Sequence, residues 1–239
     1  MEGWQGYTPT GLTPESINNM QLDAGAFFVD LDTSGLTKDS TAADFADILQ
    51  KEGMEKGKCL GATTGGGTFN AVPETRQIEA DGLKFNPKGF TVYDAWNINL
   101  STTMKEFSEK NIKIAIPTAE VLGDGSIGAR STLMLHHYID KFMWAGRLGD
   151  GRLAMIELDN VLNASGMSLT INNNGEGEVP VEFVAHQGDI TRMQYAPFRI
   201  KFFVLPEGTM TPDPDPNPEP SGESLITGDG VPFHLRSDE

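Results

Sequence analysis

The sequence is poor in cysteine, in basic residues and in long apolar runs. Cys59 is the only cysteine among 239 residues, so neither an intrachain disulfide nor a cluster of thiolate metal ligands can form. No stretch approaches the roughly 20 apolar residues that a helix needs to cross a bilayer. The first residues also lack the pattern of a secretory signal. We therefore expect a protein without a membrane span that is made and assembled in the cytoplasm.

Basic residues are outnumbered, since 18 Lys and Arg stand against 34 Asp and Glu, for a net charge of −16. Proteins that bind nucleic acid conventionally present basic stripes to the phosphates, and this acidity argues against such a role. Solubility alone would explain the charge as well. The charge therefore excludes one class of function without choosing another.

Motifs that carry chemistry are also missing. The chain has no nucleophile elbow, no His-Glu-x-x-His, no phosphate-binding loop and no dinucleotide fingerprint. His136 and His137 are adjacent, so on a strand they point to opposite faces and cannot bind one ion together. Aromatic residues make up only 8% of the chain, which is few for a sugar-binding cleft. We predict no catalytic residue, no metal ligand and no cofactor, and hence no enzyme.

The residues that are abundant favour β structure. A hydrophobic content of 38% allows a real core, and 27 glycines with 14 prolines favour a turn-rich, mostly-β chain. In the segment Val92–Met104, Trp96, Ile98, Leu100 and Met104 share one face, which predicts a strand with one buried side. Asp150-Gly151 predicts a tight hairpin turn. Further strands are expected at Ala24–Leu31, within Ser131–Trp144, at Arg152–Leu158, Met167–Ile171, Val179–Ala185 and Phe198–Leu205.

Two helices are expected within this β framework. Ser108 is a candidate N-cap for a short helix that stops at Pro117. A second helix follows Asp39-Ser40-Thr41 and ends at Gly53, with an apolar face of Ala42, Phe45, Ile48 and Leu49. The predicted fold is an antiparallel β-sandwich or barrel-like core of about eight strands, with one packed α-helix, a helical insertion and an extended C-terminal tail.

The predicted organisation has five parts. An irregular N-terminal arm (1–21) precedes a β domain (22–205), which carries the helical insertion (33–58). A proline-rich linker (206–220) then leads to a C-terminal extension (221–239), because prolines at almost every second position favour an extended spacer. The extension is either a disordered acidic tail or a tether whose apolar end grips a neighbouring subunit.

Several stretches, taken in order, resemble the tail tube (major tail) proteins of long-tailed phages of Gram-positive bacteria. The resemblance covers roughly Ser16 to Leu205, and no single motif in it is specific. Its force lies in the order and spacing of the matching stretches. These are Leu22–Phe28, Leu60–Phe69, Pro73–Gly82, Trp96–Ala115, Gly146–Asn163 and Val179–His186.

The resemblance implies a structural function in the virion. Subunits would form hexameric rings that stack into the tail tube, the conduit for DNA delivery into the host cell. The implied partners are further copies of the chain, a tape measure protein, and the tail terminator and distal tail proteins. DNA would pass through the lumen without sequence-specific binding, and a negative lumen would repel its phosphates.

The resemblance also directs attention to three groups of residues. The insertion helix, through Phe45, Ile48 and Leu49, is the candidate for contact between rings; docking on its own domain is the equal alternative. The glycines Gly65, Gly66 and Gly67 are candidates for close backbone approach between subunits. Acidic candidates for the lumen are Glu74, Glu79 and Asp81.

Two alternatives remain open from the sequence. One is an extracellular or virion-surface β-sandwich module, immunoglobulin-like or carbohydrate-binding, which would be a stable monomer with exposed aromatics in a cleft. The other is the inner tube of a contractile tail.

Overall fold

Two groups of antiparallel strands are joined through one long strand, β7 (Leu153–Asn163). The structure is a computed structural model, and it describes residues 13, 15–171, 176–189, 191 and 194–205. The sheet has the order β1-β6-β7-β8-β3-β2, and β9 also pairs with β7. The remaining bounds are β1 (Ala26–Val29), β2 (Thr63–Gln77), β3 (Thr91–Met104), β6 (Ile139–Arg147), β8 (Val179–Val184) and β9 (Phe198–Phe203).

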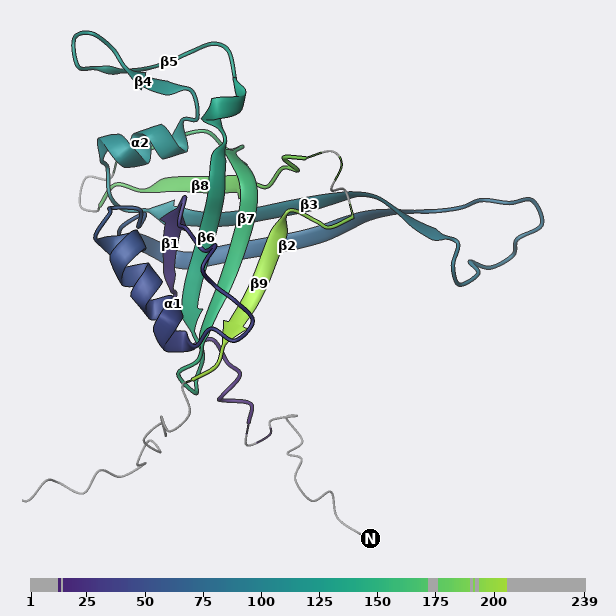
Figure 1. Ribbon diagram of the computed structural model, residues 1–239. Helices are drawn as coiled ribbons and strands as arrows, with labels where there is room; N and C mark the ends of the chain where they lie inside the picture. Colours follow the sequence, from purple (N-terminus) through teal and green to yellow (C-terminus); the bar gives the residue numbers. More distant parts are fainter. Residues whose placement is uncertain (1–12, 14, 172–175, 190, 192–193, 206–239) are drawn as a thin grey trace, which may run out of the picture. The chain divides into compact units, whose positions relative to one another are not determined.

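The strand β7 changes partners along its length. Its first half, Leu153–Leu158, pairs with β9, whereas Leu162 and Asn163 pair with β8. Between them Asn160 has a φ of 49°, and asparagine is one of the few residues that tolerate this left-handed conformation. This bend separates the β1-β6-β7-β9 group from the β8-β3-β2 group, and the two groups cross in Figure 1. Such a corner is typical of orthogonally packed sheets.

The main core lies between these two groups. Phe142 of β6 lies 4.0 Å, centroid to centroid, from Phe183 of β8, and 5.9 Å from Phe27 of β1. Ile98 and Leu100 of β3 are each 2% exposed in the same cluster. The mostly-β prediction is confirmed, and the packing of two strand groups around one core agrees with a sandwich.

Both predicted helices exist. Helix α2 (Glu109–Ala115) begins at Ser108, whose Oγ accepts a hydrogen bond from Asn111 N at 3.2 Å. Helix α1 (Ala42–Ile48) begins at Thr41 in a capping box and continues as the π-helical turn η1 (Leu49–Met54). The predicted end at Gly53 is wrong by one residue, because Gly53 lies inside that turn, which ends at Met54. Gly53 lies against the Phe28 ring, where a Cβ would come within 2.5 Å of a ring carbon. None of the helices in the described part of the chain is long and apolar enough to cross a membrane.

Two strand predictions need correction. Met167–Ile171 is not a strand; only Thr170 forms a bridge, to Glu178, while Met167 and Leu169 pack on the core. Burial, rather than strand pairing, produced their alternation. The second correction concerns Ser131–Trp144, where the strand β6 begins only at Ile139. His136 and His137 lie before it, in a 3-10 turn, η2 (Leu135–His137), and not on a strand. A small hairpin of β4 (Ala119–Val121) and β5 (Ile127–Ala129) precedes that turn.

Of the predicted N-terminal arm (1–21), the structure describes residues 13 and 15–21. Residues 15–21 of the predicted arm contact the β6–β7 turn, where Gln21 bridges Leu148 and Gly149 N donates to Met20 O. The predicted linker (206–220) and extension (221–239) lie outside the described residues.

Candidate assembly surfaces

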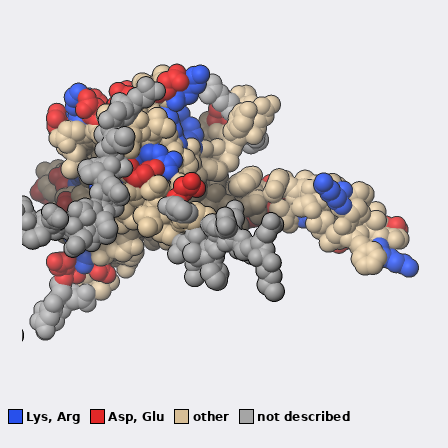
Figure 2. All heavy atoms as spheres, turned by 90° about the horizontal axis from the view of Figure 1, so that it is seen from below, with Lys and Arg blue, Asp and Glu red and all other residues tan. Residues whose placement is uncertain are grey.

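The strands β2 and β3 continue past the sheet as a two-stranded ribbon. β3 pairs with β8 only from Asn99 to Met104, but it pairs with β2 as far as Thr91. Among the described residues, the segments Val72–Gln77 and Thr91–Asn97 therefore pair only with each other, and the loop 78–90 closes them. Figures 1 and 2 show this ribbon projecting from the rest of the domain. We call it the β2–β3 ribbon.

The ribbon exposes large apolar side chains. Tyr93 and Trp96 are 64% and 45% exposed, and Phe85 in the closing loop is 86% exposed. The sequence predicted that Trp96 would share the buried face of Ile98, Leu100 and Met104, and this is wrong. The other three are at most 2% exposed, whereas Trp96 lies beyond the end of β8, and no further strand pairs with β3 there in the described part of the chain except β2. An isolated two-stranded hairpin is marginally stable in water, and among the described residues the ribbon leaves these apolar side chains exposed.

The glycine run forms a bulge where β2 joins the body. The register with β3 shifts between Thr64 and Gly67, and Gly65 and Gly66 have φ values of 72° and 67°. A Cβ on Gly67 would lie 2.6 Å from the Phe27 ring and 2.7 Å from Ser101 O. The close approach at Gly67 is thus made within the chain. The bulge also opens a cavity of about 350 Å³ that is lined by β2, β3 and β8.

The apolar face of helix α1 packs against its own domain. Phe45 is fully buried and stacks on Phe203 of β9 at 4.2 Å between ring centroids. Ile48 and Leu49 are partly buried against the same cluster. In this chain, therefore, the three side chains pack as the own-domain alternative describes. A contact between rings stays a prediction, and only Ile48 and Leu49 retain surface for it.

The acidic lumen candidates lie on the ribbon. Glu74 is an exposed residue of β2, and Glu79 and Asp81 are exposed in the closing loop. The structure therefore places all three on the same projecting element. Their orientation toward a lumen stays a prediction.

One buried carboxylate ties the insertion to the sheet. Glu157 of β7 is 1% exposed; it accepts a hydrogen bond from Thr33 Oγ1 at 2.7 Å and is paired with Arg199 and Lys141. On the same strand, burial and the charge of Glu157 raise the pKa of Asp159. A buried charge of this kind is tolerated because it has several partners. The described residues include no group of three or more His, Cys, Asp or Glu side chains that could hold a metal ion.

Sequence reasoning missed two apolar surfaces. Phe198, Ile200, Phe202 and Val204 were expected on one side of a strand, yet the last three are 48%, 58% and 59% exposed. Leu135, in the 3-10 turn, is 90% exposed. Periodicity shows which side chains share a face of a strand, but it does not show whether another element covers that face.

Comparison with known proteins gives little to set beside this geometry. No family model and no curated protein matches the chain. Nine chains of solved structures match it, among them one from the virion of a native gene transfer agent (GTA) particle, with a TM-score of 0.31 and 13% sequence identity. That match covers 77% of this chain and 100% of the other. At this TM-score we draw no conclusion about this chain from the likeness.

Proposed function

We propose that the chain is a structural virion protein whose copies associate into hexameric rings that stack into a phage tail tube. Its place would be the virion tail, assembled in the cytoplasm of the bacterial host. Its role would be to line a conduit for DNA rather than to catalyse a reaction. The β2–β3 ribbon is the observation that carries this proposal, together with the sequence resemblance.

The ribbon is built to be covered by other copies. From the Val72–Asn97 pair to the Gln77–Thr91 pair, neither strand has a third strand beside it among the described residues. Unpaired edges are a liability that proteins remove by pairing or covering them. Pro73 lies in β2, where it has no N–H to leave unpaired. Contacts with neighbouring copies would bury Tyr93, Trp96 and Phe85, which the chain itself leaves exposed.

A closed ring would cover such an element on every copy. A heterologous contact, in which a ribbon meets a different surface of the next copy, closes into a ring when the rotation permits. The ring number of six comes from the resemblance and is part of the proposal. The implied partners, a tape measure, a terminator and a distal tail protein, belong to the same proposal.

Electron microscopy of the purified full-length chain, over a concentration and salt series, tests this function. We expect rings or hollow tubes of uniform width, which class averages would show to have sixfold symmetry. Solution mass would be measured on the same samples by light scattering. A monomer at every concentration and salt would overturn the proposal and favour the β-sandwich binding module instead.

A further inference from the structure

The chain contains four Asp-Gly pairs, a dipeptide in which the aspartate rearranges readily. Three of them lie in the described residues, at Asp81-Gly82, Asp124-Gly125 and Asp150-Gly151, and the fourth, Asp229-Gly230, lies outside them. The rearrangement begins when the glycine nitrogen attacks the side-chain carboxyl carbon of the aspartate. Glycine favours this attack because it has no side chain beside the nitrogen and adopts many backbone conformations.

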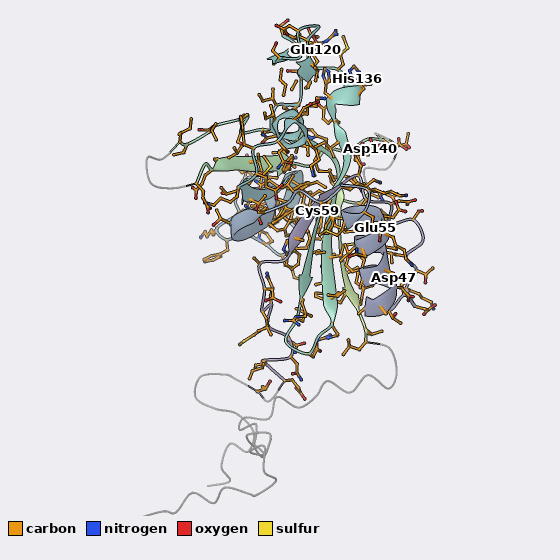
Figure 3. All side chains as sticks on the ribbon, turned by 90° about the vertical axis from the view of Figure 1, so that its left-hand side faces the viewer. Asp47, Glu55, Cys59, Glu120, His136 and Asp140 are labelled. Atoms are coloured by element: carbon orange, nitrogen blue, oxygen red, sulfur yellow. The ribbon has the colours of Figure 1, made fainter. Side chains whose placement is uncertain are left out.

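The three described pairs have the same backbone conformation at the glycine. Gly82, Gly125 and Gly151 have φ values of 85°, 83° and 86°. One pair lies in the loop that closes the β2–β3 ribbon (Figure 1), one lies between β4 and β5, and one lies between β6 and β7. Figure 3 marks the second of these hairpins by its label on Glu120 of β4. Neither the dipeptide nor the glycine conformation therefore distinguishes the three pairs.

At the β6–β7 turn, hydrogen bonds hold both of the reacting groups. Asp150 Oδ1 accepts a hydrogen bond from Arg152 N at 3.0 Å, and the Arg152 guanidinium pairs with the same carboxylate. Gly151 N donates to Leu148 O at 3.0 Å. These bonds have to open before the nitrogen of Gly151 can reach the carboxyl carbon of Asp150.

The β4–β5 turn is held in the same way. Asp124 Oδ1 accepts hydrogen bonds from Ser126 N at 3.0 Å and from Ser126 Oγ at 2.6 Å, and Gly125 N donates to Leu122 O at 2.9 Å. The bonds from Ser126 lower the pKa of Asp124. Ring closure releases a carboxyl oxygen as water, which leaves more easily from the protonated acid. A carboxyl that stays ionised is therefore less reactive.

The pair in the ribbon loop lacks these bonds. Asp81 and Gly82 are exposed, and among the described residues neither the Asp81 carboxylate nor Gly82 N has a hydrogen-bond or ion-pair partner. The turn itself has one backbone hydrogen bond, from Leu83 N to Ala80 O at 3.2 Å. A Cβ on Gly82 would meet no atom within 4 Å, so the two groups have room to rotate toward each other.

We propose that Asp81 is a site of spontaneous isomerisation to isoaspartate in the folded chain, whereas Asp124 and Asp150 are protected from it. The Gly82 nitrogen bonds to Asp81 Cγ, its proton leaves with a carboxyl hydroxyl as water, and a cyclic succinimide forms. Water then adds to a ring carbonyl. Opening at the side-chain carbonyl restores aspartate, and opening at the main-chain carbonyl leaves the chain running through Cβ and Cγ. The water released in the first step is replaced in the second, so no further reactant is needed.

The modification changes the covalent structure of the ribbon. Isoaspartate adds one carbon to the main chain of the loop 78–90 and leaves a carboxylate as a branch on the Cα of Asp81. The same loop carries the exposed Phe85. The inference holds whether or not copies associate, so it stands or falls independently of the proposed function.

Isotope labelling of the full-length chain tests the proposal. The chain is kept at neutral pH in water enriched in the heavy oxygen isotope, because hydrolysis of the succinimide places one solvent oxygen in either product. Trypsin, used afterwards in ordinary water, separates the three pairs into the peptides 77–84, 114–130 and 148–152. Mass spectrometry measures the label in each peptide, and an isoaspartate-specific methyltransferase identifies the isomerised product.

In the folded chain, peptide 77–84 is expected to gain label at least about tenfold faster than the other two, because opening a hydrogen bond to a charged group slows a reaction by about that factor or more. In guanidinium chloride, where the hydrogen bonds of the fold are lost, the three peptides should gain label at similar rates. Similar labelling of all three in the folded chain would overturn the proposal. So would a folded chain whose peptide 77–84 stays unlabelled while all three peptides gain label in the denaturant.

Two variants test the site and the cause of its selectivity. Asp81→Glu keeps the charge but requires a larger ring, so it should abolish labelling of peptide 77–84; label that persists would refute Asp81 as the site. Ser126→Ala removes the hydrogen bond from Ser126 Oγ to Asp124, so it should raise labelling of peptide 114–130 severalfold and leave peptide 77–84 unchanged. An unchanged rate in peptide 114–130 would refute hydrogen bonding as the cause of the protection.

Discussion

The β9–α1 side of the domain buries large apolar side chains, whereas the β2–β3 ribbon leaves them exposed. On this side, Phe45 and Phe203 stack with no exposure to solvent, and the buried Glu157 carboxylate is paired with Lys141 and Arg199 and accepts a hydrogen bond from Thr33. On the ribbon, the ring centroids of Tyr93 and Trp96 lie 5.7 Å apart, yet the two residues stay 64% and 45% exposed. The first region completes its packing within the chain, whereas the ribbon does not.

This contrast separates stability from association. Changes beneath α1 should lower the free energy of unfolding, because they remove contacts that one copy makes with itself. Changes on the ribbon should leave that free energy nearly unchanged and alter only what copies do together. Each prediction below can break this separation or make it sharper.

The largest loss of stability is expected from Phe45→Ala. Removing a fully buried ring leaves a cavity against Phe203 and should cost about 3–5 kcal/mol of unfolding free energy. Urea denaturation followed by circular dichroism measures this loss. The control on the same helix is Asp47→Ala, whose side chain is 70% exposed and should change stability by less than about 0.5 kcal/mol. Similar effects in the two variants would show that α1 does not pack as described.

A smaller loss is expected where the ribbon strand joins the body. In Gly67→Ala the new methyl would press on the Phe27 ring and on Ser101 O, at a cost of about 1–3 kcal/mol. Gly35→Ala is the matched control, since it meets no atom within 4 Å and should be neutral or stabilising by up to about 1 kcal/mol. Thermal unfolding of both variants compares them. A harmless Gly67→Ala would contradict the close approach at the bulge.

On the ribbon itself, the expected effect on folding is smaller still. Phe85→Asp should change the unfolding free energy by no more than about 0.5 kcal/mol, because the side chain is 86% exposed. Assembly should weaken strongly, since a charge then replaces the apolar tip of the loop. Light scattering at matched concentrations measures assembly, and urea denaturation measures stability. If the variant assembles like the parent, the loop that carries Phe85 is not part of the contact between copies.

The smallest effect concerns pH. The raised pKa of Asp159 means that the folded state prefers its protonated form, so its contribution to stability is full below the ordinary value of 3.8 and is lost as pH rises through the folded pKa. Asp159→Asn should therefore raise the melting temperature slightly at neutral pH, and the gain should shrink toward pH 3.8. A gain that grows on acidification would contradict the assignment of burial as the main cause.

Local signals in the sequence predicted local structure well. Ser108 caps α2, Thr41 caps α1, and Asp150-Gly151 turns the β6–β7 hairpin, because each depends on residues a few positions apart. The exposure of Trp96 and Phe202 depends instead on where β8 ends and which strand lies at an edge. The bend at Asn160 likewise becomes meaningful only when β8 and β9 are both seen to pair with β7.

For the residues predicted to mediate assembly, the sequence likewise identified local features but not the partners that these residues contact in the fold. Gly67 was correctly recognised as a place of close approach, but its partner is Phe27 of the same chain. The apolar face of α1 was also correctly identified, but its Phe45 stacks on Phe203 of β9 in the same chain. The exposed apolar group Leu133, Met134 and Leu135 was missed altogether, because these residues fit no period. Their importance comes from their exposure, which only the fold determines.

Hydrogen–deuterium exchange, compared between dilute monomer and concentrated assemblies, tests the central claim most directly. We expect the amides on the outer edges of Val72–Gln77 and Thr91–Asn97 to become strongly protected on assembly, while those of β6 and β7 change little because each of these strands has a neighbour on both sides. Exchange of the ribbon that stays the same at every concentration, while the solution mass rises, would contradict the claim that copies complete the packing of this element.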